Sequence, residues 1–232
     1  MTDVIRALLR GLVASLSIAV GYLPIAFSFG LAAVEAGLSP NATLLISAAV
    51  FAGASQFLLI ALLVSGAAWW TAVPTVLLMN ARHLFYGPAL VNRLPARTAP
   101  LPAPLLAFGL TDEVFATALS KVDRVPAAER ETWLVGLQLG AYSAWLLGTW
   151  LGTRLSGRID LLPDFARDAL GFVLPALFLS LLLEIGVARW KTPILVAAAS
   201  AAVLLAVLPA HHALALGIVA GALAHAIARP RA

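Results

Sequence analysis

The chain has 232 residues, of which 62% are hydrophobic and 11% charged, with a formal net charge of +4 and no cysteine. Soluble domains average about 25% charged residues, so this composition excludes an ordinary soluble domain and indicates an integral membrane protein. The lack of cysteine excludes disulfides and thiolate metal sites. The basic residues lie at the ends of apolar segments and in short loops, which is typical of membrane anchoring and argues against nucleic-acid binding.

Apolar runs long enough to cross a bilayer as a helix recur along the chain. The first follows Arg6 and Arg10 and continues to about Val34, which is too long for a cleavable signal peptide. The predicted spans are residues 11–35, 42–66, 69–91, 104–120, 132–152, 169–188, 193–208 and 212–228. Polar residues interrupt the fourth span, and the last two are short enough to form one hairpin of partial helices. The sequence therefore predicts an all-α polytopic transmembrane helical bundle of seven or eight spans, with a single domain over residues 1–232.

Small residues recur every four positions in the predicted span at 132–152, and two glycines repeat this spacing in the last span. The residues are Gly136, Gly140, Ala144, Gly148 and Gly152, and later Gly217 and Gly221. Each set lies on one helix face, where small side chains let two backbones approach closely. We expect this face to pack within the chain rather than to form a subunit interface.

Helix breakers or hydrogen-bonding side chains lie near the midpoints of five predicted spans. They are Pro24, Ser55 with Gln56, Asn80, Asp112 with Glu113, and Pro175. Each alone has a structural explanation, because proline kinks and polar contacts between helices are common in membranes. Together, at one depth, they are typical of transporters, whose kinked or broken helices expose backbone groups to a substrate near the midplane. The sequence therefore predicts a polar cavity.

Arg82 lies two residues past the centre of the span at 69–91. A charge at that depth costs roughly 2.5–3.5 kcal/mol on insertion scales, so it needs a partner or a task. In one interpretation, Arg82 forms an ion pair with Asp112 or Glu113 that fixes two helices together. In the other, its planar guanidinium binds the carboxylate of a substrate. The two are compatible if the substrate displaces the acid. His83 and a buried acid would be the natural groups for proton coupling.

Four stretches, in this order, carry a resemblance to a known family. They are residues 21–27 (GYLPIAF), 51–57 (FAGASQF), 80–84 (NARHL) and 110–113 (LTDE). The chain resembles the AzlC family of bacterial branched-chain amino acid permeases, the large subunit of LIV-E type exporters. The match covers most of the chain and is densest before residue 120. The resemblance implies export of leucine, isoleucine, valine and sometimes methionine. It also implies a small, separately encoded, very hydrophobic AzlD-type membrane subunit as partner.

Taken together, these features predict a multi-pass transporter of the bacterial inner membrane that exports a small zwitterion, without enzymatic activity, cofactor or metal. Asn80 and Arg82 are expected to bind the carboxylate, and Asp112 or Glu113 to receive the ammonium group. The apolar pocket is assigned to Gly21, Pro24, Ser55 and Gln56, and proton coupling or ion pairing to His83, Asp112 and Glu113. Two alternatives stay open: an assembly subunit whose polar groups only join helices, and an intramembrane enzyme using His83 with an acid.

Overall fold

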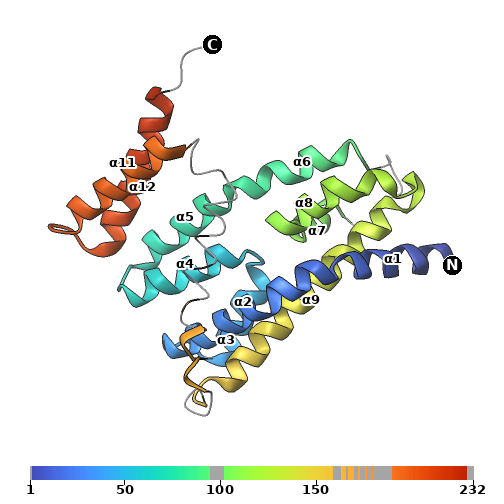
Figure 1. The fold of residues 1–232 in the computed structure, drawn as a ribbon, viewed down its shortest axis with the longest axis horizontal. Coiled ribbons are helices and arrows are strands. Elements are labelled where there is room, and N and C mark those ends of the chain that lie inside the picture. Colours follow the sequence, from blue (N-terminus) through green and yellow to red (C-terminus); the bar gives the residue numbers. More distant parts are fainter. Residues whose placement is uncertain are drawn as a thin grey trace. The chain divides into compact units, whose positions relative to one another are not determined.

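The computed structural model describes residues 2–94, 102–158 and 190–228, with scattered positions between 163 and 179. Every regular element in these residues is helical, which confirms the all-α prediction for this part of the chain (Figure 1). By contacts the chain divides into a large unit, Met1–Ile60 with Val76–Leu174, and a small unit, Ala61–Thr75 with Pro175–Ala232. The single domain predicted over residues 1–232 stays a prediction.

The large unit holds most of the helices. They are α1 (Thr2–Ala14), α2 (Leu16–Glu35), α3 (Pro40–Ala49), the first part of α4 (Gly53–Val64), the end of α5 (Trp69–Asn80), the 3₁₀ segment η1 (Ala81–Phe85), α6 (Tyr86–Val91), α7 (Ala103–Phe108), α8 (Asp112–Lys121), the 3₁₀ turns η2 (Val122–Arg124) and η3 (Ala127–Glu129), and α9 (Arg130–Leu155). The small unit holds the remaining parts of α4 and α5 together with α11 (Lys191–Leu204) and α12 (Ala210–Ala228).

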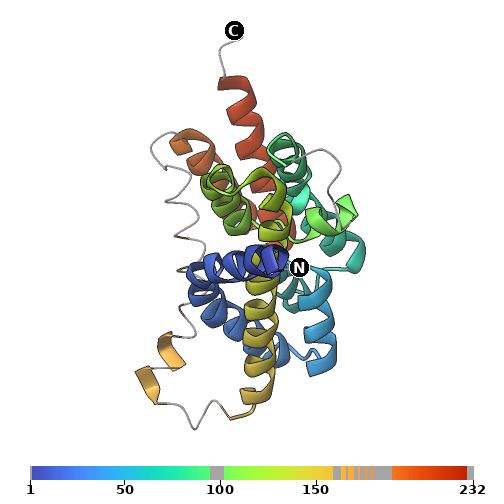
Figure 2. The ribbon, with the colours of Figure 1, turned by 90° about the vertical axis from the view of Figure 1, so that its right-hand side faces the viewer.

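The long helix α9 packs along α1 and α2 through its glycine face (Figures 1 and 2). A Cβ atom at Gly136 would collide with the carbonyl oxygen of Leu8, and one at Gly152 with that of Phe27. A Cβ atom at Gly148 would lie 2.6 Å from the carbonyl oxygen of Leu23. The expectation that this repeat packs within the chain is therefore confirmed for α9, and we call this contact the glycine seam.

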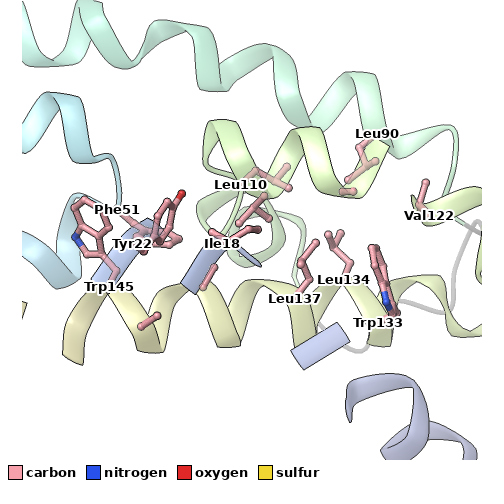
Figure 3. Close-up of a cluster of buried hydrophobic side chains, with 14 of the residues drawn as sticks. Ile18, Tyr22, Phe51, Leu90, Leu110, Val122, Trp133, Leu134, Leu137 and Trp145 are labelled. Atoms are coloured by element: carbon pink, nitrogen blue, oxygen red, sulfur yellow. The ribbon is translucent and has the colours of Figure 1, made fainter. Parts of the chain in front are cut away.

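The hydrophobic core of the large unit lies between α9, α2 and the segments that pack beside them (Figure 3). Tyr22 of α2 packs edge-on against Trp145 of α9, with ring centroids 5.0 Å apart, and against Phe51 at 6.1 Å. Leu110 and Leu134 are also buried here, at 4% and 1% exposed. Because Phe51 and Leu110 belong to non-helical segments, this core holds two chain interruptions beside α2 and α9.

Three predicted spans are interrupted near their midpoints. The span at 42–66 is divided at residues 50–52 between α3 and α4, and the span at 69–91 changes to 3₁₀ geometry in η1. The span at 104–120 is divided at residues 109–111 between α7 and α8. The prediction of broken helices is confirmed at these three places.

Pro24 does not break its helix. A kink or a break was expected there, and the break is wrong, because α2 runs continuously from Leu16 to Glu35. The glycine seam explains this, since Gly148 and Gly152 of α9 hold α2 on the turns that follow Pro24. Pro175 and most of the predicted span at 169–188 lie outside the described residues.

Helix length alone identifies few complete membrane crossings. Among the described residues, α2 is the one helix both long and apolar enough to cross a membrane unaided, while Gly53–Val64, Lys191–Leu204 and His212–Ile227 are shorter apolar helices. Each of the three interrupted predicted spans is divided into helices of twelve residues or fewer. Large apolar side chains are nevertheless exposed on both units, including Leu78 at 73% and Ile227 at 83%.

In the small unit, α11 and α12 form the helical hairpin expected for the last two predicted spans. A Cβ atom at Gly217 would lie 2.8 Å from the carbonyl oxygen of Ala197. One at Gly221 would lie 2.6 Å from the carbonyl oxygen of Pro193. The two glycines of α12 thus repeat the close backbone packing of the glycine seam.

Candidate functional site

A hollow of about 270 Å³ lies where the three interruptions meet, and we call it the Asn80 hollow. The first break contributes Ala49, Val50, Phe51 and Ala52, the second contributes Leu77, Asn80 and His83, and the third contributes Ala107, Phe108 and Leu110. Its volume is close to the lower end of the roughly 300–1,000 Å³ typical of small-molecule pockets. Its wall combines two hydrogen-bonding side chains with aromatic and aliphatic ones, which suits a small amphiphilic ligand.

Asn80 is the last residue of α5 and is held by α4. The buried hydroxyl of Ser55 donates a hydrogen bond to the side-chain oxygen of Asn80. With the oxygen directed at Ser55, the amide NH₂ is the donor group that Asn80 can offer to a ligand, and it suits an anion such as a carboxylate. Ser55 therefore orients Asn80 and is absent from the wall of the hollow.

Gln56 holds the first interruption in place. Its side-chain NH₂ donates to the carbonyl oxygen of Val50, and its oxygen accepts from the indole N–H of Trp145 at 3.2 Å. The hydroxyl of Tyr142 donates to the carbonyl oxygen of Ala48 at 2.9 Å. These bonds satisfy carbonyl groups at the end of α3, where the helix provides no further donors. Gln56 of α4, itself held by Trp145 of α9, thus shapes the site by fixing the backbone of the break.

Arg82 and Asp112 form an ion pair, with 2.6 Å between Nη2 and Oδ2. The hydroxyl of Tyr86 donates to the other carboxylate oxygen of Asp112. Asp112 begins α8, where the helix dipole stabilises a negative charge. Nε of Arg82 is buried and has no hydrogen-bond partner among the described residues. The guanidinium therefore has a free donor in addition to the pair.

Glu113 is bound by a second tyrosine. The hydroxyl of Tyr22 donates to Oε2 of Glu113 at 2.5 Å, so it can accept from the hydroxyl of Thr111, 2.6 Å away. The Thr111 oxygen also caps α8 by accepting from the backbone N–H of Val114 at 3.3 Å. Both acids at the start of α8 are thus held by phenols, Asp112 by Tyr86 and Glu113 by Tyr22.

Tyr22 and Tyr86 are the functional candidates that sequence reasoning missed. Tyr22 lies inside the stretch 21–27 and Tyr86 directly follows the segment with Arg82 and His83. The available signal was chemical, since a phenol within an apolar helix needs a hydrogen-bond partner, and the acids at 112–113 were the nearest candidates by depth.

The structure does not bring Gly21 and Pro24 to the site, which corrects their assignment to the pocket. Both are exposed on α2, and nothing lies within 4 Å of a Cβ atom built at Gly21. Tyr22, one residue along, faces the core at 4% exposed. The reason is helical rotation, because successive residues differ in direction by about 100° on a helix and the glycine seam fixes which face of α2 turns inward.

His83 lines the Asn80 hollow and packs edge-on against Tyr86, with ring centroids 5.1 Å apart. Through Tyr86 it lies next to the Arg82–Asp112 pair. Its proton-coupling role stays a prediction. Within the residues that the structure describes, no group of three or more His, Asp or Glu side chains could hold a metal ion.

The interrupted spans and their polar residues fall within the region matched by one protein family. The model described as "AzlC protein" matches residues 17–159, which include every predicted site residue. This chain belongs to the AzlC family. The AzlC family is a membrane transport family, so the chain is a membrane transport protein.

Relatives of this AzlC family member include "Inner membrane protein YgaZ" of Escherichia coli K12, which is 44% identical over 170 residues, covering 73% of this chain and 69% of YgaZ. An "Uncharacterized membrane protein" of Archaeoglobus fulgidus is 41% identical over 174 residues, covering 75% of this chain and 74% of the relative. "Branched-chain amino acid transport protein AzlC" of Bacillus subtilis is 27% identical over 165 residues, covering 71% and 62%. No solved structure matches the chain.

Proposed function

We propose that this AzlC family protein exports branched-chain and other hydrophobic amino acids across the bacterial inner membrane. It does so together with a small hydrophobic AzlD-type subunit. The observation that carries the proposal is the Asn80 hollow, a small amphiphilic space at the junction of three interrupted spans. The name of the Bacillus subtilis relative supports the choice of substrate.

Asn80, Phe51 and Phe108 line the hollow, whereas Arg82, Asp112 and Glu113 do not. The Arg82–Asp112 pair lies beside its wall residue His83, through Tyr86. Together these groups match the three parts of a branched-chain amino acid. The amide NH₂ of Asn80 and the guanidinium of Arg82 offer donors to the carboxylate. Asp112 or Glu113 can receive the ammonium group. Phe51, Phe108 and Leu110 offer apolar surface to the side chain.

A zwitterion is suited to enter an existing ion pair. Separating Arg82 from Asp112, which are only partly exposed, would leave two charges without a counter-charge, and this is unfavourable. In the proposed exchange, the substrate carboxylate pairs with Arg82 and the substrate ammonium group pairs with Asp112. Both protein charges therefore keep a counter-charge. A neutral apolar molecule offers no such exchange and is excluded.

In this proposal the chain crosses the membrane seven or eight times, and α3–α4, α5–α6 and α7–α8 each form one interrupted crossing. Their breaks then lie at similar depth, as in transporters with discontinuous helices. The exposed side chains of Leu78, Leu84 and Ile227 contact lipid or the partner subunit. His83 and Asp112 are the proposed proton-coupling groups.

Reconstituted efflux tests the proposal. Proteoliposomes that hold this chain and its small partner, preloaded with labelled leucine or valine, should release the label faster than protein-free vesicles. An Asn80→Ala variant should release it more slowly. In cells fed a leucine-containing dipeptide, expression should lower intracellular leucine, whereas higher leucine would show import. If no amino acid of a full panel is released or raises the melting temperature, the proposal fails and the assembly-subunit alternative is favoured.

A further inference from the structure

Phe108 lines two separate hollows. One is the Asn80 hollow, and the other is a hollow of about 250 Å³, which we call the Gln138 hollow. The remaining wall of the second consists of Leu105, Gly109, Val135, Gln138, Leu139 and Tyr142. Since the phenyl side chain of Phe108 borders both spaces, it forms part of the partition between them.

Two other aromatic rings fix the position of this partition. The ring of Phe108 lies 6.3 Å from that of Phe51 and 5.9 Å from that of Tyr142, and Phe51 and Tyr142 pack edge-on at 5.0 Å. Phe51 belongs to the core at 6% exposed, and the hydroxyl of Tyr142 is bonded to the carbonyl oxygen of Ala48. Phe108 is 44% exposed and ends the six-residue helix α7, so it is the member of this group that tolerates substitution.

We propose that Phe108 sets the upper size of the apolar side chain that the transporter accepts. The inference rests on the proposed function and deepens it by naming a specificity-determining residue. Truncation of Phe108 joins the Asn80 hollow to the Gln138 hollow. Val135, Leu139 and the ring of Tyr142 then supply apolar surface to a longer substrate side chain. The joined space is larger than the existing Asn80 hollow of about 270 Å³, so it accepts a longer side chain such as that of an aromatic amino acid.

Leu110 is a second partition but a poorer candidate. It lines both the Asn80 hollow and an apolar hollow of about 420 Å³ beside Leu90 and Leu134. However, Leu110 is 4% exposed and belongs to the hydrophobic core, so its truncation leaves a cavity in the core and destabilises the fold. Truncation of Phe108 can therefore change substrate selectivity while the fold is kept, whereas truncation of Leu110 destabilises the fold.

Efflux selectivity in proteoliposomes tests this inference. Wild type, Phe108→Ala, Phe108→Leu and Phe108→Trp are compared by their release of labelled phenylalanine, leucine and valine. We expect Phe108→Ala to raise the phenylalanine-to-leucine ratio by about tenfold or more, because a few methylene groups of fit change selectivity by 10–200-fold. Phe108→Leu should raise it less. Phe108→Trp should lower the leucine-to-valine ratio, because the larger indole narrows the hollow.

Leu105→Ala is the matched control. Leu105 lies on the same helix, is 56% exposed and lines the Gln138 hollow but not the Asn80 hollow. Its truncation enlarges the neighbouring space without opening the partition, so the phenylalanine-to-leucine ratio should stay within about twofold of wild type, well below the tenfold step. An equal change in this control would overturn the inference.

An unchanged ratio in Phe108→Ala, with leucine efflux retained, would also overturn the inference. If Phe108→Ala does not fold, the other two variants test the inference. Phe108→Leu should favour the larger substrate, phenylalanine over leucine, and Phe108→Trp the smaller one, valine over leucine. Failure of both shifts would overturn the inference. Absence of efflux by the wild-type complex for every amino acid would instead contradict the proposed function itself.

Discussion

The glycine seam and the three interrupted spans pack in opposite ways. Along the seam, the backbone of α9 meets the backbone of α1 at Gly136 and that of α2 at Gly152. Around α7, by contrast, hollows of about 250, 270 and 420 Å³ adjoin one short helix. At the interruptions, side chains such as Gln56 and Tyr142 replace the missing helical hydrogen bonds.

This difference assigns different roles to the two regions, because the glycine seam supports the fold and the interruptions form the candidate site. Close backbone packing makes the contact of α1 and α2 with α9 a rigid frame, which has few ways to move. Interrupted helices leave polar groups and space, but they need side chains from the rigid frame to hold them. Sites whose binding groups are held by such a frame bind with defined geometry. We therefore expect substitutions in the seam to act on stability and those at the interruptions to act mainly on transport.

The largest expected effect is at the seam. Gly136→Leu places a side chain against the backbone of Leu8, so two helix backbones must move apart to accommodate it. We expect loss of folded protein, measured as loss of a monodisperse peak and of a cooperative thermal transition in detergent. Overpacking commonly costs about 1–3 kcal/mol, and contact with backbone rather than with a flexible side chain puts this variant above that range.

Gly21→Leu is the matched control, because nothing lies within 4 Å of a Cβ atom at that position of α2. It should fold with a melting temperature near that of wild type. Normal folding of Gly136→Leu would remove the distinction between a rigid seam and a looser site.

The Arg82–Asp112 pair is expected to show the next largest effect. Arg82→Ala leaves Asp112 without its counter-charge, while adding Asp112→Asn should recover part of the lost stability. Because the two side chains are 40% and 31% exposed, the cost should fall below the roughly 3–5 kcal/mol of a fully buried pair. Stability in urea or by melting measures this cycle, and efflux measures function. Stability should recover in the double variant, whereas leucine efflux should stay low because the carboxylate has lost Arg82.

Normal efflux by an Arg82→Ala variant that assembles correctly would contradict a carboxylate-binding role for Arg82. Recovery of both stability and efflux in the double variant would indicate an ion pair that only joins α8 to η1.

The smallest effect is expected at Ser55. Ser55→Ala removes the hydrogen bond to Asn80 and should cost about 1 kcal/mol of stability. Asn80 then loses its fixed orientation, so the KM for leucine should rise severalfold while assembly is retained. Ser65→Ala is the control, since the hydroxyl of Ser65, just past the end of the same helix, donates to the carbonyl oxygen of Leu62 and not to Asn80. An equal rise of KM in the control would show that Ser55 does not act through Asn80.

The sequence predicted correctly those features that depend only on how far a polar residue lies along an apolar run. Ser55, Asn80 and Asp112 lie at or beside interruptions because a polar group near the middle of an apolar run competes with the regular helix or needs a partner. The same reasoning was wrong at Pro24, where packing of α2 on α9 overrides the loss of one backbone hydrogen bond. It also missed Tyr22, whose partners on α8 are about ninety residues away in the chain.

The sequence by itself determined the all-helical class, the AzlC family, the glycine face of α9 and the interruption of three spans. These follow from hydropathy, residue size and polarity read along one dimension. Only the tertiary structure decided that Tyr22 rather than Gly21 faces the site, that Arg82 pairs with Asp112 while Tyr22 holds Glu113, and that Phe108 separates two hollows. The reason is that rotation of a helix and the choice of partner depend on close packing between distant segments, and no local pattern specifies them.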